Sequence, residues 1–286
     1  MHPMLHTAVR AARAAGRVML ANIDRLDRLQ IKDKGKNELV SQVDRQAEKA
    51  IVDMLRNTYP DHSIKAEECG AIAGNPAYQW IIDPLDGSGN FLRGIPQFCV
   101  SIALKAHGRI AVGVIYDPIK EELFTTSRGN GAYLNDRRIR VTARRALDGA
   151  ALATEFPSHR HCVNQPYLQL FMELLRATGD VRRQGCAALD LAYVACGRLD
   201  GYWSSALADW DMAAGALLMQ EAGGLVGDFN GGHQHLETGD IVAATPKLFP
   251  AILKIIRPHL ASLPTGRQAA ATSGGAATPR RAALTG

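Results

Sequence analysis

Hydrophobic side chains recur at helical spacing in two segments near the start of the chain. In the first segment they are Leu5, Val9, Ala12, Ala15 and Met19. In the second, which spans residues 41–58, they are Val43, Ala47, Ala50, Ile51, Met54 and Leu55. Each set falls on one face of an α-helix. Ser41 and Asp44 have the spacing of a capping box, and Pro60 follows the second segment. The pattern predicts two amphipathic helices.

Short apolar runs with strand character follow. The run at residues 80–82 ends at Asp83 and Pro84, and the runs at 100–105 and 110–116 flank a His107-Gly108 turn, which is typical of a hairpin. Residues 122–126 and 132–134 are two further predicted strands. We therefore expect a first lobe, up to about residue 145, of two helices and several mainly antiparallel strands.

From residue 146 onwards, predicted strands and helices alternate. The predicted strands are 152–154, 201–203 and 241–244, and the predicted helices are 167–178, 187–196, 212–222 and 246–256. Alternation of this kind indicates a layered α/β lobe. We expect a single domain over residues 1–260 with lobes at about 1–145 and 146–260. Residues 261–286 are rich in Ala, Gly, Thr, Ser and Pro and predict a disordered basic tail.

Composition narrows the class of protein. Hydrophobic residues make up 47% of the chain and charged residues 21%, which allows a large core without disulfides. The five cysteines are widely spaced and contain no CxxC pair, so neither a zinc knuckle nor a disulfide framework is indicated, and a cytoplasmic location is expected. Three of the five net positive charges lie in the tail, which leaves too little charge to indicate nucleic-acid binding. No apolar run is long enough to predict a membrane span.

The segment WIIDPLDGSGNF at residues 80–91 carries the strongest chemical signal. Asp83 follows a buried strand and Asp86 comes three residues later, so two carboxylates lie close together and repel unless a cation lies between them. Mg²⁺ prefers such oxygen ligands, and Leu85 can add a backbone carbonyl. The amides after Gly87 can bind a phosphate oxygen. The alternative is that both aspartates only make Asx-turns around Pro84.

Two other acidic positions also follow or precede predicted elements. Glu67 comes after the apolar Ile64, and Asp211 precedes a predicted helix. Asp211 can be explained as a helix cap and Glu67 as a solvated loop residue. A two-metal site would instead use all four carboxylates.

The sequence resembles the inositol monophosphatase family, and its bacterial members most closely, over roughly residues 5–257. The motifs that carry the resemblance are WIIDPLDGSGNF at 80–91, AEE at 66–68, WDMAAG at 210–215, NELVSQVD at 37–44 and GCAALDLAYVACGRLDGYW at 185–203. The first and the third of these are the most specific. The resemblance implies an αβαβα sandwich, a homodimer, Mg²⁺ dependence and sensitivity to lithium.

The resemblance also implies roles for individual residues. The metal ligands fall on Glu67, Asp83, the Leu85 carbonyl, Asp86 and Asp211. The implied catalytic residues are Asp44 and Ser88, which orient a water near Glu67; capping of the second helix is the alternative role of Asp44. The implied substrate contacts are Asp86, Gly87, Ser88, Arg183, Gly185, Cys186, Ala187 and Asp211, of which Gly87 and Ser88 face the phosphate.

Two departures from the family pattern affect the expected specificity. Ser88-Gly89 stands where the family usually has Thr-Thr, which keeps one hydroxyl and loses the other. Ser204, seven residues before Asp211, stands where a glutamate usually binds inositol hydroxyls. We therefore expect substrate choice to shift away from inositol monophosphate.

These observations predict a Mg²⁺-dependent phosphomonoesterase that acts on inositol monophosphate or a related small polyol or sugar phosphate. One alternative is the same chemistry on a nucleotide 3′-phosphate or a sugar bisphosphate. A second alternative is a binding role with RNA polymerase and the transcription machinery in ribosomal RNA antitermination, because some bacterial relatives have that association.

Overall fold

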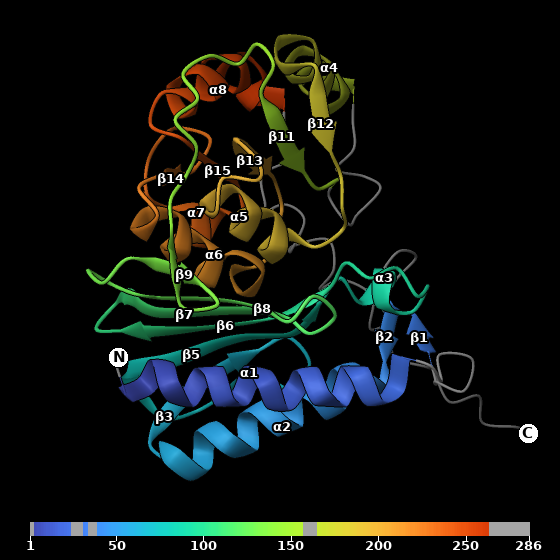
Figure 1. Ribbon diagram of the computed structural model, residues 1–286, viewed down its shortest axis with the longest axis vertical. Helices are drawn as coiled ribbons and strands as arrows, with labels where there is room; N and C mark the ends of the chain where they lie inside the picture. Colours follow the sequence, from blue (N-terminus) through green and yellow to red (C-terminus); the bar gives the residue numbers. More distant parts are fainter. Residues whose placement is uncertain (1–2, 24–30, 34–38, 157–164, 263–286) are drawn as a thin grey trace, which may run out of the picture.

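The computed structural model describes residues 3–23, 31–33, 39–156 and 165–262 (Figure 1). Its elements form five layers. Helices α1 (Pro3–Asn22) and α2 (Gln42–Thr58) cover one face of the larger sheet. Helices α5 (Ala187–Ala195) and α6 (Asp209–Glu221) lie between the two sheets, and α4 (Gln165–Thr178) and α8 (Leu248–Ile256) cover the outer face of the smaller sheet. This order confirms the predicted αβαβα sandwich.

In the described residues the larger sheet has the strand order β10-β9-β8-β7-β6-β5-β3-β4. Its strands are β3 (His62–Ala66), β4 (Gly70–Ile72), β5 (Asn75–Asp86), β6 (Cys99–Ala106), β7 (Arg109–Asp117), β8 (Glu122–Ser127), β9 (Ala132–Leu134) and β10 (Arg137–Ile139). The β6–β7 hairpin was predicted. The β3–β5 pair is parallel, so the sheet is mixed. A separate two-stranded ribbon pairs β1 (Ile31–Asp33) with β2 (Leu39–Ser41).

The smaller sheet has the order β12-β11-β13-β15-β14. Its strands are β11 (Ala151–Thr154), β12 (Asp180–Arg182), β13 (Gly201–Ser204), β14 (Leu225–Gly227) and β15 (Ile241–Ala244). Strand β11 runs parallel to both β12 and β13, whereas β15 is antiparallel to its neighbours. The remaining elements are the short helices α3 (Ser88–Phe91) and α7 (His235–Thr238) and a 3₁₀ helix, Arg257–Ser262.

Helices α5 and α6 are buried on all sides because both sheets pack against them. Every residue of α5 is buried, as expected for a helix that is apolar all round. The two helices approach closely at Gly215, where an added Cβ would lie 2.6 Å from a methyl carbon of Leu191. On the sheet side, a Cβ at Gly113 would lie 3.0 Å from the Ala214 carbonyl oxygen. The small residues of WDMAAG therefore set the spacing of the central layer.

Two local expectations were wrong. The strand that carries Asp83 does not end there: β5 continues through Pro84 to Asp86, with an irregular register against β6 between Asp83 and Asp86. The last helix begins at Leu248, two residues after Pro246; its N-cap is Lys247, and the Leu248 amide donates back to the hydroxyl and the carbonyl of Thr245. Of the tail, residues 263–286 lie outside the described residues. None of the described helices is long and apolar enough to cross a membrane.

Candidate active site

The end of β5 and the start of α3 form the centre of the site. The Asp83 carboxylate accepts a hydrogen bond from the Leu85 amide at 3.0 Å, so one oxygen makes the Asx-turn that was weighed as an alternative. Gly87 follows at φ 90°, and a Cβ there would lie 2.8 Å from the Gln97 carbonyl oxygen, so a side chain at this position would be excluded. This geometry places Ser88 at the first turn of α3.

Four carboxylates interact at this point. Burial raises the pKa of Asp83 well above its ordinary value, and the charges of Glu67, Asp86 and Asp211 raise it further. Burial also raises the pKa of Asp211, and again Asp86 and Glu67 add to the effect. Because each acid disfavours ionisation of the others, the cluster is electrostatically unfavourable without a cation. The fold therefore brings together Glu67 from the end of β3, Asp83 and Asp86 from β5, and Asp211 from α6.

The donor set suits a hard divalent cation. Carboxylates and a backbone carbonyl are the ligands that such ions prefer, and a cation among them would remove the mutual repulsion. The residues available to hold it are Glu67, Asp83, Asp86, Asp211 and the buried Leu85, whose carbonyl lies within the same segment. The individual ligand assignments remain predictions.

Glu48 on α2 positions the Glu67 segment. Its two carboxylate oxygens accept hydrogen bonds from the Glu68 and Cys69 amides, both at 2.8 Å. Glu48 is buried, as is Asp44 one helical turn before it. The buried face of α2 thus carries two acids, of which Glu48 contacts the segment that follows Glu67. Sequence analysis predicted Asp44 but not Glu48.

Two polar contacts hold the start of α6, which carries Asp211. Lys65 of β3 forms an ion pair with Asp209 at 2.8 Å, and the Ser101 hydroxyl of β6 donates to the Trp210 carbonyl at 3.2 Å. Asp211 was expected to precede this helix as its N-cap, but α6 begins at Asp209, Ala208 is the N-cap, and Asp211 is the third helical residue, whose carboxylate accepts from the Ala208 amide at 2.8 Å. Capping therefore orients a carboxylate that also faces the other acids.

The substrate-side loop, residues 183–187, packs directly against the β5–α3 segment. The Asn90 amide nitrogen donates to the carbonyls of Gln184 and Gln97, both at 2.8 Å. Just after the loop, the Ala188 amide donates to the Asp86 carboxylate at 2.6 Å. The predicted substrate contacts Gly185, Cys186 and Ala187 therefore lie beside the predicted phosphate contacts Gly87 and Ser88.

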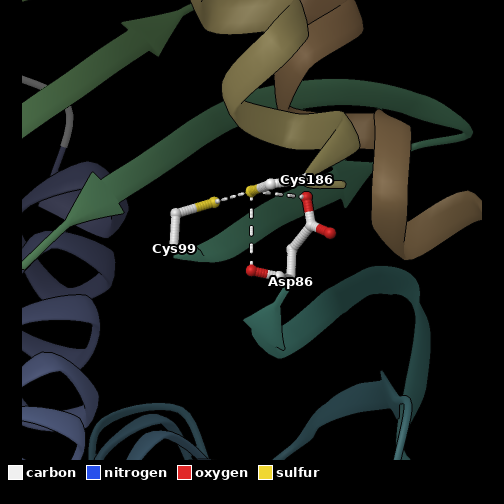
Figure 2. Close-up of side chains that lie close together, drawn as sticks. All are labelled: Asp86, Cys99 and Cys186. Atoms are coloured by element: carbon white, nitrogen blue, oxygen red, sulfur yellow. Dashed lines mark hydrogen bonds between the residues drawn. The ribbon is translucent and has the colours of Figure 1, made fainter. Parts of the chain in front are cut away.

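Cys186 lies between Cys99 and Asp86 (Figure 2). Its thiol donates to the Asp86 carboxylate at 3.2 Å, and its sulfur lies 3.6 Å from that of Cys99. Burial raises the pKa of the Cys99 thiol to about 11 and that of Cys186 well above its ordinary value. Both groups are therefore thiols rather than thiolates, which agrees with packing and donor roles and not with a nucleophile.

The remaining substrate-side residues differ in exposure. The Arg183 side chain is 53% exposed and its guanidinium lies 3.6 Å from the Glu155 carboxylate. Ser204 is fully buried, and its hydroxyl donates to the Glu155 backbone carbonyl at 3.4 Å. Residue 204 thus faces the core around Glu155. Sequence reasoning missed Glu48, Asn90 and Glu155, whose partners lie far away along the chain.

Comparison with known proteins identifies the family of this chain. The model of the inositol monophosphatase family matches residues 1–261. The Nus factor SuhB of Pseudomonas aeruginosa is 51% identical over 265 residues, which cover 91% of this chain and 98% of the relative. The Nus factor SuhB of Escherichia coli strain K12 is 48% identical over 261 residues, at the same coverage of 91% and 98%.

Solved structures give the same result. The extragenic suppressor protein suhB from Bartonella henselae is 43% identical, with a TM-score of 0.86 over 88% of this chain and 98% of that one. The inositol monophosphatase from Anabaena (Nostoc) sp. PCC 7120 is 37% identical, with a TM-score of 0.79 over 91% and 96%. With sequence, fold and acidic cluster in agreement, this chain belongs to the inositol monophosphatase family.

Proposed function

We propose that this protein is a Mg²⁺-dependent phosphomonoesterase that acts on inositol monophosphate or a related small polyol or sugar phosphate. The observation that carries the proposal is the mutual interaction of Glu67, Asp83, Asp86 and Asp211 in a cluster whose central acid, Asp83, is buried. Four acids held together in this way oppose folding unless a ligand compensates their charge. Membership of a phosphatase family supports the same assignment.

Each group in the site has a part in this chemistry. Glu67, Asp83, Asp86, Asp211 and the Leu85 carbonyl would hold Mg²⁺, which when bound would lower the pKa of water and neutralise charge on the phosphate. The Gly87 and Ser88 backbone faces the phosphate oxygens at the positive end of α3. Ser88, Asp44 and Glu67 orient the attacking water, with Glu67 also accepting its proton.

The alcohol part of the substrate lies against the substrate-side loop. Gly185, Cys186 and Ala187 contact the substrate hydroxyls there together with Asp211, while Asp86 lies beside this loop and Arg183 lies at its exposed side. Because Ser204 is buried and uncharged, this side lacks the glutamate that family members usually place at that position. The same catalytic groups would serve a nucleotide 3′-phosphate or a sugar bisphosphate.

Phosphate release with and without Mg²⁺ tests the proposal. Asp83→Asn should remove at least about 99% of activity, since it deletes a charge needed for the metal. Asp53→Asn, on the exposed face of α2, is the matched control and should retain full activity. Normal turnover by Asp83→Asn at saturating Mg²⁺, with inositol 1-phosphate and p-nitrophenyl phosphate as substrates, would contradict the site assignment.

A second candidate function rests on the two relatives described above, both of which are named Nus factor SuhB, at 51% and 48% identity. We propose that the chain also associates with the transcription machinery and, like its family generally, forms a homodimer in the cytoplasm. Pull-down of RNA polymerase with Asp83→Asn should succeed as well as with the wild type if binding is independent of catalysis. Light scattering measures the oligomeric state. Absence of polymerase from both pull-downs would contradict the binding role.

A further inference from the structure

A buried glutamate holds the substrate-side loop from beneath. Glu155 is the first residue after β11, and its side chain is only 11% exposed. Its Oε1 accepts a hydrogen bond from the Gly185 amide at 2.7 Å, and its Oε2 lies 3.6 Å from the Arg183 guanidinium. Gly185 adopts φ 80°, a left-handed backbone conformation that is open to glycine because it has no Cβ. One carboxylate thus contacts two residues of the loop.

A second buried acid supports the first. Asp190, in the first turn of α5, accepts a hydrogen bond from the Gln184 side-chain amide at 2.6 Å. Burial raises the pKa of Asp190 well above its ordinary value, and the nearby charge of Glu155 raises it further. Burial also raises the pKa of Glu155 to about 7. The two buried acids therefore lie close enough to influence each other's ionisation. Arg183, Gln184 and Gly185 are therefore all held by this pair.

The other side of the loop is coupled to the metal site. Asn90 of α3 binds the Gln184 carbonyl, and the thiol of Cys186 binds the Asp86 carboxylate. Ser204 does not share this task, because its hydroxyl reaches only the backbone carbonyl of Glu155 among the contacts described. The acidic groups beneath the loop are accordingly Glu155, which forms the ion pair with Arg183, and Asp190, which binds Gln184.

We propose that Glu155 is a positioning residue that fixes the substrate-side loop and the Arg183 guanidinium, and that it thereby sets the selectivity of the enzyme among substrate alcohols. The selectivity part rests on the proposed phosphatase function, whereas the positioning part does not. Glutamine at this position can still accept from the Gly185 amide but cannot form the ion pair with Arg183. Alanine can do neither.

Amide hydrogen exchange of the full-length protein tests positioning without reference to catalysis. Glu155→Ala should speed exchange of the Gly185 amide by about tenfold or more, since a hydrogen bond to a charged group is lost, and Glu155→Gln should have a smaller effect. Glu173→Ala, at an exposed site on α4, is the control and should leave the loop unchanged. Unchanged exchange of residues 183–187 in Glu155→Ala overturns the proposal.

Steady-state kinetics tests selectivity. In Glu155→Ala the KM for inositol 1-phosphate should rise about tenfold, while the KM for p-nitrophenyl phosphate and the Mg²⁺ requirement change less than about threefold. The KM of Glu155→Gln for inositol 1-phosphate should lie between those of the wild type and Glu155→Ala. If the KM rises equally for both substrates and the Mg²⁺ requirement also rises, Glu155 acts on the metal site. That result would overturn the proposed role of Glu155 in selectivity. A wild type that hydrolyses neither substrate overturns the proposed function, and hydrogen exchange then still decides the positioning role.

Discussion

Replacing Asp86 by asparagine should stabilise the metal-free protein while it removes activity. Burial raises the pKa of Asp86 from 3.8 to about 6. The ionised form is thus disfavoured in the folded state, so the acid costs stability as pH rises from about 4 to about 6. At about 1.4 kcal/mol per pH unit, the cost above pH 6 is about 3 kcal/mol. Asparagine carries no charge and avoids it.

The substitution also has a cost. The Ala188 amide and the Cys186 thiol both donate to Asp86 Oδ2, which the asparagine carbonyl oxygen can replace. The other oxygen becomes an amide group that can no longer accept from the Gly87 backbone, which loses about 1 kcal/mol. The net gain in the free energy of unfolding is about 2 kcal/mol. For a chain of this size, this corresponds to a Tm about 4–8 °C higher in EDTA at pH 7.5. Near pH 4.5 the gain should largely vanish, because wild-type Asp86 is then protonated in the folded state.

Thermal melts in EDTA and in excess Mg²⁺ provide the assay. Mg²⁺ at about 100 times its Kd should stabilise the wild type by about 2.7 kcal/mol and Asp86→Asn by much less. The order of stability of the two proteins should therefore reverse when Mg²⁺ is added. An asparagine variant that melts below the wild type in EDTA at pH 7.5, yet gains fully from Mg²⁺, would refute the electrostatic reasoning.

Four further outcomes are expected. Ser204→Glu should lower the free energy of unfolding by on the order of 3 kcal/mol, because it buries another carboxylate beside Glu155. Urea melts measure the change, and an unchanged midpoint would mean that the glutamate side chain reaches solvent. Glu48→Ala should weaken Mg²⁺ activation about tenfold, because the Glu68 and Cys69 amides lose their acceptor. Mg²⁺ titration of phosphate release measures this, and unaltered activation would exclude a link between Glu48 and the metal site. Deletion of residues 263–286 should leave kcat/KM for inositol 1-phosphate unchanged, since that composition buries little apolar surface, and a large loss would show that the tail docks. Millimolar Li⁺ should inhibit phosphate release, as the family resemblance implies, and insensitivity would indicate a divergent metal site.

Much of the layer order follows from periodicity. The stripes of α1 and α2 and the β6–β7 hairpin were predicted because a helical or alternating pattern reports which face is buried. The parallel pairing of β3 with β5 was missed because apolar runs do not encode the direction of a partner strand. Strand β5 continues past Asp83 because a bulge accommodates Pro84, which has no amide hydrogen to donate.

The candidate site was predictable only in part, because the sequence does not show which distant residues the fold brings together. Asp83 and Asp86 stand in one compact motif, and their neighbours Glu67 and Asp211 stand in two others. Glu48 and Glu155 carry no local signal, since their partners are backbone amides 20 and 30 residues away that only the fold brings near. Charged residues in sequence are ordinarily solvated, so burial of these two acids becomes evident only in three dimensions.

The central claim is that Glu67, Asp83, Asp86 and Asp211 form a divalent-metal site. Anomalous diffraction from crystals soaked in Mn²⁺ tests it most directly, because Mn²⁺ accepts the same oxygen ligands as Mg²⁺ and can be located by its scattering. We predict anomalous density enclosed by these four carboxylates, with the Leu85 carbonyl oxygen also within bonding distance, and its loss in Asp83→Asn. An empty carboxylate cluster at saturating Mn²⁺ would contradict the account.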